Sequence, residues 1–164
     1  MNDEWYTPEY AVVPIVKYLK PCSTIWCPFD KADSKFVKTF SKRGFSVIHT
    51  HIEDGIDFFD LCVPDVDYII SNPPFSVMDK VLEKLFLISK PFAMLCNVEK
   101  IFGSSKRFGV LRYNPFELII MSPRVNYISR DGVRRNNPTF QSGYVCSGIC
   151  QKQINFEEVE RRIT

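Results

Sequence analysis

The stretch Asp67-Tyr68-Ile69-Ile70-Ser71-Asn72-Pro73-Pro74-Phe75 decides the fold that we expect for this chain. Its first half is apolar and partly β-branched, which predicts a buried strand over Val66–Ser71. The two prolines each fix φ and lack a backbone N–H, so that strand must end at Asn72. After them, apolar residues recur at helical spacing from Val77 to Ile88, and Ser76 with Asp79 resembles a capping box. The stretch therefore predicts a strand, a tight turn and a helix.

The same alternation of extended and helical patterns continues on both sides of this unit. Strands are predicted over residues 23–27, 45–48, 56–59, 66–71, 92–98, 118–121 and 140–146. Helices are predicted from Thr7-Pro8 toward Leu19, from Asp33 or Ser34 to Gly44, and over 76–88, 104–113 and 156–163. This order predicts a single α/β domain over residues 1–164. We expect a mostly parallel, seven-stranded sheet with helices on both faces and an antiparallel edge strand.

Length and composition fit one soluble globular domain. The chain has 164 residues, of which 45% are hydrophobic and 24% are charged. No apolar run reaches the roughly 18 residues of a membrane span, and the acidic N-terminus does not resemble a signal peptide. We therefore expect a cytoplasmic protein without a membrane partner.

Six cysteines raise the alternatives of a metal site or disulfides. They form no Cys-x-x-Cys pair, and the chain has only two histidines, His49 and His51. Four of the six cysteines lie in apolar, strand-like surroundings, where a free thiol behaves as a small hydrophobic side chain. We interpret them as reduced thiols and expect no metal.

Charge is distributed unevenly along the chain, although its net value is only +2. Residues 1–68 carry 11 acidic and 7 basic side chains, whereas residues 104–135 carry 7 basic side chains against Glu117 and Asp131. This asymmetry favours a surface that meets phosphates, the alternative being a solvated basic loop.

Asn72-Pro73-Pro74-Phe75 resembles the Asn/Asp-Pro-Pro-aromatic signature of S-adenosylmethionine-dependent amino-methyltransferases. These enzymes act on adenine N6, cytosine N4 or a glutamine amide nitrogen. The resemblance covers about residues 4–146, is greatest to short phage or mobile-element adenine methyltransferases, and implies a Rossmann-like methyltransferase fold. The alternative for the motif itself is a common strand-ending Asn-Pro turn.

The motif's residue types suit transfer to an amine whose lone pair is delocalised. The Asn72 side-chain oxygen and the Pro73 carbonyl can each accept one amine hydrogen, which favours a pyramidal, nucleophilic nitrogen. Consecutive prolines, Pro73 and Pro74, fix φ and expose carbonyls, and Phe75 offers a face on which a flipped base can stack. Phe140 resembles the aromatic residue on the other side of the target-base pocket, or else it fills the core.

The resemblance also implies where S-adenosylmethionine binds. The N-terminal segment would close over it, the loop after the first strand would hold its methionine part, and an acidic stretch would hold its ribose and adenine. The corresponding residues are Tyr6, Thr7 and Pro8; Pro28, Phe29 and Asp30; and His51, Glu53, Asp57 and Phe58. The loop lacks the family's glycines, and Asp57 with Phe58 has the alternative of capping a turn and filling the core.

For the substrate, we expect Arg124, Arg130, Arg134 and Arg135 to contact phosphates. The leading hypothesis is methylation of an exocyclic amino group, adenine N6 in DNA or RNA. Two alternatives stay open: a protein glutamine-amide methyltransferase, and a non-catalytic, degenerate methyltransferase fold that binds nucleic acid or protein. Without a recognition domain, the chain either has low specificity, acts on RNA or relies on a partner that supplies specificity.

Overall fold

The computed structural model describes residues 6–128 and 139–161, which form four α-helices, two short 3₁₀ helices and seven strands. In chain order they are α1 (Glu9–Val16), β1 (Thr24–Cys27), α2 (Lys35–Lys42), β2 (Ser46–His49), η1 (Ile52–Asp54), β3 (Tyr68–Ser71), η2 (Phe75–Val77), α3 (Met78–Ile88), β4 (Phe92–Asn97), α4 (Ser105–Tyr113), β5 (Glu117–Ser122), β6 (Ser142–Ser147) and β7 (Ile154–Glu158).

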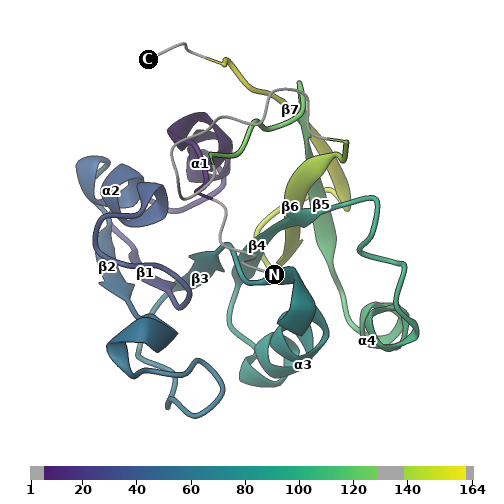
Figure 1. Cartoon of the computed structure of the whole chain (residues 1–164), viewed down its shortest axis with the longest axis horizontal. Coiled ribbons are helices and arrows are strands. Elements are labelled where there is room, and N and C mark those ends of the chain that lie inside the picture. Colours follow the sequence, from purple (N-terminus) through teal and green to yellow (C-terminus); the bar gives the residue numbers. More distant parts are fainter. Residues whose placement is uncertain (1–5, 129–138, 162–164) are drawn as a thin grey trace.

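The strands form one sheet in the order β2-β1-β3-β4-β6-β5-β7. The first four are parallel to one another, and β6 runs antiparallel to both of its neighbours, β4 and β5. The antiparallel strand thus lies inside the sheet and not at its edge, because β7 pairs in parallel with β5 and becomes the edge (Figure 1). The predicted seven-stranded, mostly parallel α/β sheet is confirmed.

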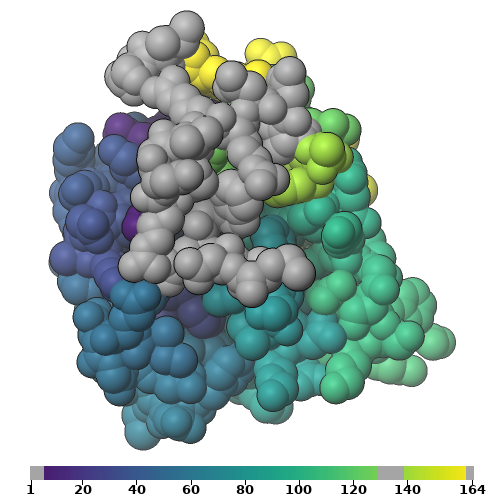
Figure 2. Space-filling view, in the orientation of Figure 1, coloured from purple at the N-terminus to yellow at the C-terminus, as the bar shows by residue number. Residues whose placement is uncertain are grey.

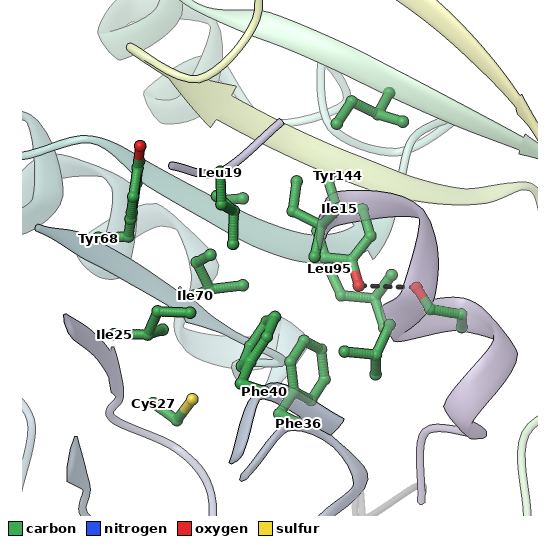
Figure 3. Packing of buried hydrophobic residues seen from close by; sticks show 14 of the residues in the cluster. Ile15, Leu19, Ile25, Cys27, Phe36, Phe40, Tyr68, Ile70, Leu95 and Tyr144 are labelled. Atoms are coloured by element: carbon green, nitrogen blue, oxygen red, sulfur yellow. Dashed lines mark hydrogen bonds between the residues drawn. The ribbon is translucent and has the colours of Figure 1, made fainter. Parts of the chain in front are cut away.

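Helices cover both faces of this sheet. Figure 1 shows α1 and α2 on one side and α3 and α4 on the other, and two buried clusters follow this division. In the first cluster, Phe36 and Phe40 of α2 pack against Ile25 and Ile70 of the strands (Figure 3). Tyr144 of β6 donates a 2.8 Å hydrogen bond to the Ala11 carbonyl, which ties α1 to the sheet.

Two helices begin at the predicted positions. The Ser34 hydroxyl accepts a hydrogen bond from Val37 N at 3.2 Å at the start of α2, and Ser104 does the same for Arg107 N at 3.4 Å at the start of α4. Such caps satisfy N–H groups that have no partner within the helix. Gly44 follows the end of α2 with φ of 82°, a conformation that favours glycine.

Two predicted elements were wrong. Residues 56–59 form turns, because the carboxylate of Asp57 accepts from Phe59 N at 2.9 Å and so stabilises a local turn. Residues 154–158 form β7 and not a helix, because their backbone pairs with β5 from Leu118 to Ser122. Seven strands therefore form, although one of the seven differs from those predicted.

Two predicted helix starts also differ. α3 begins after η2 without a side-chain cap, and Asp79 contacts α4 instead of closing a capping box. α1 begins after Pro8, and the Thr7 hydroxyl accepts from Asn72 instead of capping the helix.

All six cysteines have free thiols. Within residues 6–128 and 139–161, no group of three or more His, Cys, Asp or Glu side chains is arranged to hold a metal ion. In the same ranges, no helix has the length and apolar character needed to cross a bilayer.

Candidate active site

A cleft of about 1370 Å³ lies at the carboxyl ends of β1, β3 and β4. Ligands bind in this position in open α/β sheets. It brings together most of the predicted site residues: Tyr6, Thr7, Pro28, Phe29, Asp30, His51, Asp57, Phe58, Asn72, Pro73, Pro74, Phe75 and Phe140. Pro8, Glu53 and Arg124 lie outside its lining, and Arg130, Arg134 and Arg135 fall outside the described residues.

Asn72 follows the last residue of β3 and is held from the N-terminal segment. Its Nδ2 donates to Thr7 Oγ1 at 3.1 Å. Because the amide nitrogen is bound to Thr7, the side-chain oxygen is the group that Asn72 offers to a ligand as an acceptor. Pro74 has a different role, because its carbonyl accepts from Val77 N at 3.2 Å and starts η2.

The N-terminal segment is fixed across the cleft by the chain after β5. Tyr6 N donates to the Ile128 carbonyl at 2.9 Å, and Ile128 N donates to the Tyr6 carbonyl at 3.2 Å. Tyr6, Thr7 and Ile128 all line the cleft. This antiparallel bridge places Thr7 beside Asn72 and fits the closing role expected of the segment.

Asp30 is the buried carboxylate of the cleft. Ser71 Oγ donates to its Oδ2, and the same hydroxyl accepts from Phe29 N at 3.2 Å. Burial raises the pKa of Asp30 from 3.8 to about 6, although hydrogen bonds from Ser71 and Ser34 act in the opposite direction. A buried carboxylate at the end of the first strand suits a ligand with an ammonium group.

Thr50 fixes the glycine-free loop that follows β1. Its carbonyl accepts from Asp30 N at 3.2 Å, and its hydroxyl donates to the Pro28 carbonyl at 3.4 Å. The same hydroxyl accepts from Trp26 Nε1 at 3.0 Å. The loop therefore takes its path without glycine because a buried threonine satisfies its polar groups.

The turn at residues 57–61 presents Phe58 to the cleft. The Phe58 ring lies 4.9 Å from the Phe29 ring and 5.6 Å from the Trp26 ring, between centroids. Lys84 of α3 donates to the carbonyls of Phe58, Phe59 and Leu61 at 2.6, 3.0 and 3.3 Å, respectively. Its ammonium also lies 4.9 Å from the centre of the Phe58 ring. Asp57 thus caps a turn and Phe58 is buried, as the alternative for this stretch expects, and both residues also line the cleft.

The other acidic residue expected at the ribose has a partner of its own. Glu53 forms an ion pair with Lys31 of the loop after β1. His51 Nδ1 accepts from Glu53 N at 3.2 Å and caps η1, and the His51 side chain lines the cleft.

Phe75 and Phe140 lie on the same side of the cleft and contact each other. Their ring centroids are 6.3 Å apart at 81°, an edge-to-face arrangement. The other face of Phe140 stacks on Tyr127, with centroids 5.8 Å apart. A base can enter between Phe75 and Phe140 only if the two rings separate, and Phe75, which is 39% exposed, is the less buried of them.

Five basic residues that line the cleft did not emerge as site residues from the sequence: Lys31, Lys35, Lys80, Lys100 and Arg107. Lys31 and Lys35 belong to the loop after β1 and to α2, whereas Lys80 belongs to α3, Lys100 follows β4 and Arg107 belongs to α4. Arg107 pairs with Asp79, whereas Arg124, the described member of the predicted arginine set, lies 3.7 Å from Glu99. For Arg107 alone the sequence held a signal, the excess of basic over acidic side chains in residues 104–113.

Comparisons with known proteins bear on the fold. No protein-family model matches the sequence, and no curated protein resembles it significantly in sequence. Among solved structures, a dimethyladenosine transferase from Plasmodium falciparum is similar, with a TM-score of 0.51 and 12% identity over 87% of this chain and 62% of that one. A precorrin-6y C5,15-methyltransferase from Geobacter metallireducens is more distant, with a TM-score of 0.45 and 11% identity over 88% of this chain and 93% of that one.

This chain thus spans less than two thirds of the length of the dimethyladenosine transferase. At 12% identity the similarity concerns the fold alone. The chain has a Rossmann-like α/β fold, similar to that of the dimethyladenosine transferase.

Proposed function

We propose that this protein is an S-adenosylmethionine-dependent methyltransferase that modifies the N6 amino group of adenine in nucleic acid. The observation that carries the proposal is the position of Asn72, which directly follows β3 and lines the cleft with its amide nitrogen bound to Thr7. The similarity in fold to a dimethyladenosine transferase supports it.

The residues present in the cleft fit S-adenosylmethionine. A volume of about 1370 Å³ exceeds the 300–1,000 Å³ of typical small-molecule sites and leaves room for a base beside the cofactor. Asp30 would hold the ammonium group of its methionine part, and Phe29 and Phe58 would pack beside its adenine. When bound, it supplies an electrophilic methyl group on a sulfonium.

The residues of the motif would prepare the amine. The Asn72 side-chain oxygen and the Pro73 carbonyl accept its two hydrogens, so the nitrogen lone pair is directed away from both acceptors. The methylated nitrogen would lose its extra proton along one of these two hydrogen bonds to solvent water, because a neutral amide oxygen is too weak a base to keep it. Thr7 acts as a positioning residue, since it fixes which end of the Asn72 amide faces the substrate.

Nucleic acid is favoured over a protein amide by the surroundings of Asn72. Phe75 is 39% exposed beside the motif and can stack on a base. Lys80 and Lys100 line the same cleft and can meet phosphates. A glutamine amide requires neither of these features.

Calorimetric titration with S-adenosylmethionine and with its demethylated product tests the first half of the proposal. We expect both to bind, and saturation at 100 times Kd to add about 2.7 kcal/mol to the free energy of unfolding. Absence of heat and of any shift in melting temperature would favour the non-catalytic alternative.

The substrate requires a second assay, in which labelled methyl groups are followed into oligonucleotides and into protein. We expect N6-methyladenine in the oligonucleotide. Label in glutamine side chains would support the protein alternative instead.

A further inference from the structure

α4 presents an exposed face that is both basic and aromatic. Of its nine residues, only Leu111 is buried. Phe108 and Tyr113 are 54% and 78% exposed, and Lys106 and Arg112 of the same helix are also exposed. The Arg112 guanidinium lies 5.3 Å from the centre of the Tyr113 ring. We refer to Lys106, Phe108, Arg112 and Tyr113 as the α4 face.

The inner side of α4 fixes this face next to the cleft. Arg107 pairs with Asp79 at the start of α3 and donates to the carbonyls of Lys100 and Ile101, each at 3.0 Å. Ser104 also donates to Asp79 at 3.0 Å. Since Arg107 and Lys100 line the cleft, basic side chains extend from the cleft onto α4. In Figure 2, the segment around α4 stands out at the lower right of the molecule.

We propose that the α4 face binds an unpaired strand of nucleic acid whose continuation enters the cleft. This inference rests on the proposed function and names the form of its substrate. Residues 99–113 carry four basic side chains and one acidic side chain, Glu99, so their charge complements a phosphate backbone. Phe108 and Tyr113 offer ring faces, and only unpaired bases expose the faces that stack on them.

Self-association explains the α4 face less well. α4 contains three basic side chains and no acidic side chain. A symmetric contact between two copies would place the same surface against itself and bring Lys106 and Arg112 of both copies together. Like charges at such a contact are destabilising.

Fluorescence anisotropy with a labelled single strand of about 20 nucleotides tests the inference. This length exceeds the number of nucleotides that a single small domain typically covers. Two double variants separate the two contributions: Phe108→Ala with Tyr113→Ala, and Lys106→Gln with Arg112→Gln. Matched controls lie elsewhere on the surface: Phe156→Ala on β7, where Phe156 is 76% exposed, and Lys38→Gln with Lys42→Gln on α2. Thermal unfolding of each variant checks that the fold is retained.

We expect the aromatic variant to bind the strand about tenfold or more weakly with an unchanged salt slope. The lysine–arginine variant should flatten the slope of log K against log[salt] by about 1.4, or about 0.7 per lost contact. Both control variants should bind the single strand with the affinity of the original chain. The aromatic variant and the original chain should bind a duplex of the same sequence with equal affinity.

Equal affinity of all variants for the single strand would overturn the inference, as would a change from dimer to monomer in the aromatic variant. Calorimetry with S-adenosylmethionine, run on the same proteins, separates this inference from the proposed function. Cofactor binding with no strand binding overturns the inference alone. Strand binding through the α4 face with no cofactor heat supports the inference and overturns the methyltransferase.

Discussion

Asn72 Nδ2 donates to Thr7 Oγ1 at 3.1 Å, although 65 positions separate the two residues in the chain. The contact joins the end of β3 to the N-terminal segment, which is itself bridged to Ile128. Orientation of the Asn72 amide therefore depends on three distant parts of the chain. We expect this contact to matter for turnover more than for stability.

Thr7→Val tests the contact with little change in side-chain shape. Loss of one hydrogen bond of about 0.5–1.5 kcal/mol should lower kcat by up to about tenfold, while affinity for S-adenosylmethionine is retained. Thr39→Val is the matched control, because the Thr39 hydroxyl is buried without a hydrogen-bond partner among the described residues. Steady-state kinetics of both variants decide the point, and equal kcat values for Thr7→Val and Thr39→Val would remove Thr7 from the mechanism.

Asp30 should make cofactor binding depend on pH. Its pKa is raised to about 6 by burial, and an ammonium group is attracted to the ionised form. Affinity for S-adenosylmethionine should therefore fall by up to tenfold for each pH unit below about 6, as Asp30 takes up a proton. Asp30→Asn should bind weakly at every pH. Calorimetry from pH 5 to 8 measures the affinity of the original chain and of Asp30→Asn for S-adenosylmethionine. If both affinities depend on pH in the same way, Asp30 does not have this role.

The same group should act on stability with the opposite sign. The folded chain holds the Asp30 proton more tightly than the unfolded chain, where the pKa is near 3.8. The contribution of Asp30 to the free energy of unfolding therefore decreases as the pH rises from about 4 to about 6, and it changes little above that range. The difference in melting temperature between the original chain and Asp30→Asn should follow this course, and a difference that does not vary with pH would count against a raised pKa.

Predictions from the sequence succeeded where a local pattern determines the outcome. Ser34 caps α2 and Gly44 ends it, because both effects involve only residues within a few positions. The strand before Asn72 and the helix after it follow from hydrophobic periodicity and from the two prolines. These features place Asn72 at the carboxyl edge of the sheet without any knowledge of distant contacts.

The failures arise where a distant residue decides the conformation. Asp79 has the spacing of a capping box with Ser76, yet Arg107 and Ser104 bind its carboxylate from α4. Ile154–Glu158 is too short for periodicity to separate a strand from a helix, and pairing with β5 makes it a strand. The sequence around Lys80 and Lys100 does not distinguish them from other surface lysines, and only the fold brings them to the cleft.

Lys84 should stabilise the turn that presents Phe58. Lys84→Met keeps much of the side-chain length but leaves the carbonyls of Phe58, Phe59 and Leu61 without their cationic donor. We expect a loss of about 1–3 kcal/mol in the free energy of unfolding and weaker cofactor binding. Glu83→Gln, an exposed neighbour on α3, is the control. Urea unfolding of the two variants makes the comparison, and similar midpoints would show that the turn does not need Lys84.

Gly143 lies in β6, where it pairs with Ile120 of β5. A Cβ at this position would lie 2.2 Å from the Ile119 carbonyl oxygen, so Gly143→Ala should destabilise the fold by about 1–3 kcal/mol. Gly109 on α4 has no atom within 4 Å of its Cβ position, so Gly109→Ala should stabilise by about 0.5–1 kcal/mol. Opposite shifts in melting temperature are expected, and a harmless Gly143→Ala would contradict the close approach of the two strands.

The most direct test of the central claim is mass spectrometry of nucleosides after incubation with S-adenosylmethionine and an adenine-containing single-stranded oligonucleotide. We expect the original chain to form N6-methyladenine. For Asn72→Ala, which should still bind the cofactor, we expect a loss of about a hundred- to a thousandfold in rate. Formation of N6-methyladenine at an equal rate by Asn72→Ala, or no methylated adenine from a chain with bound cofactor, would contradict the account.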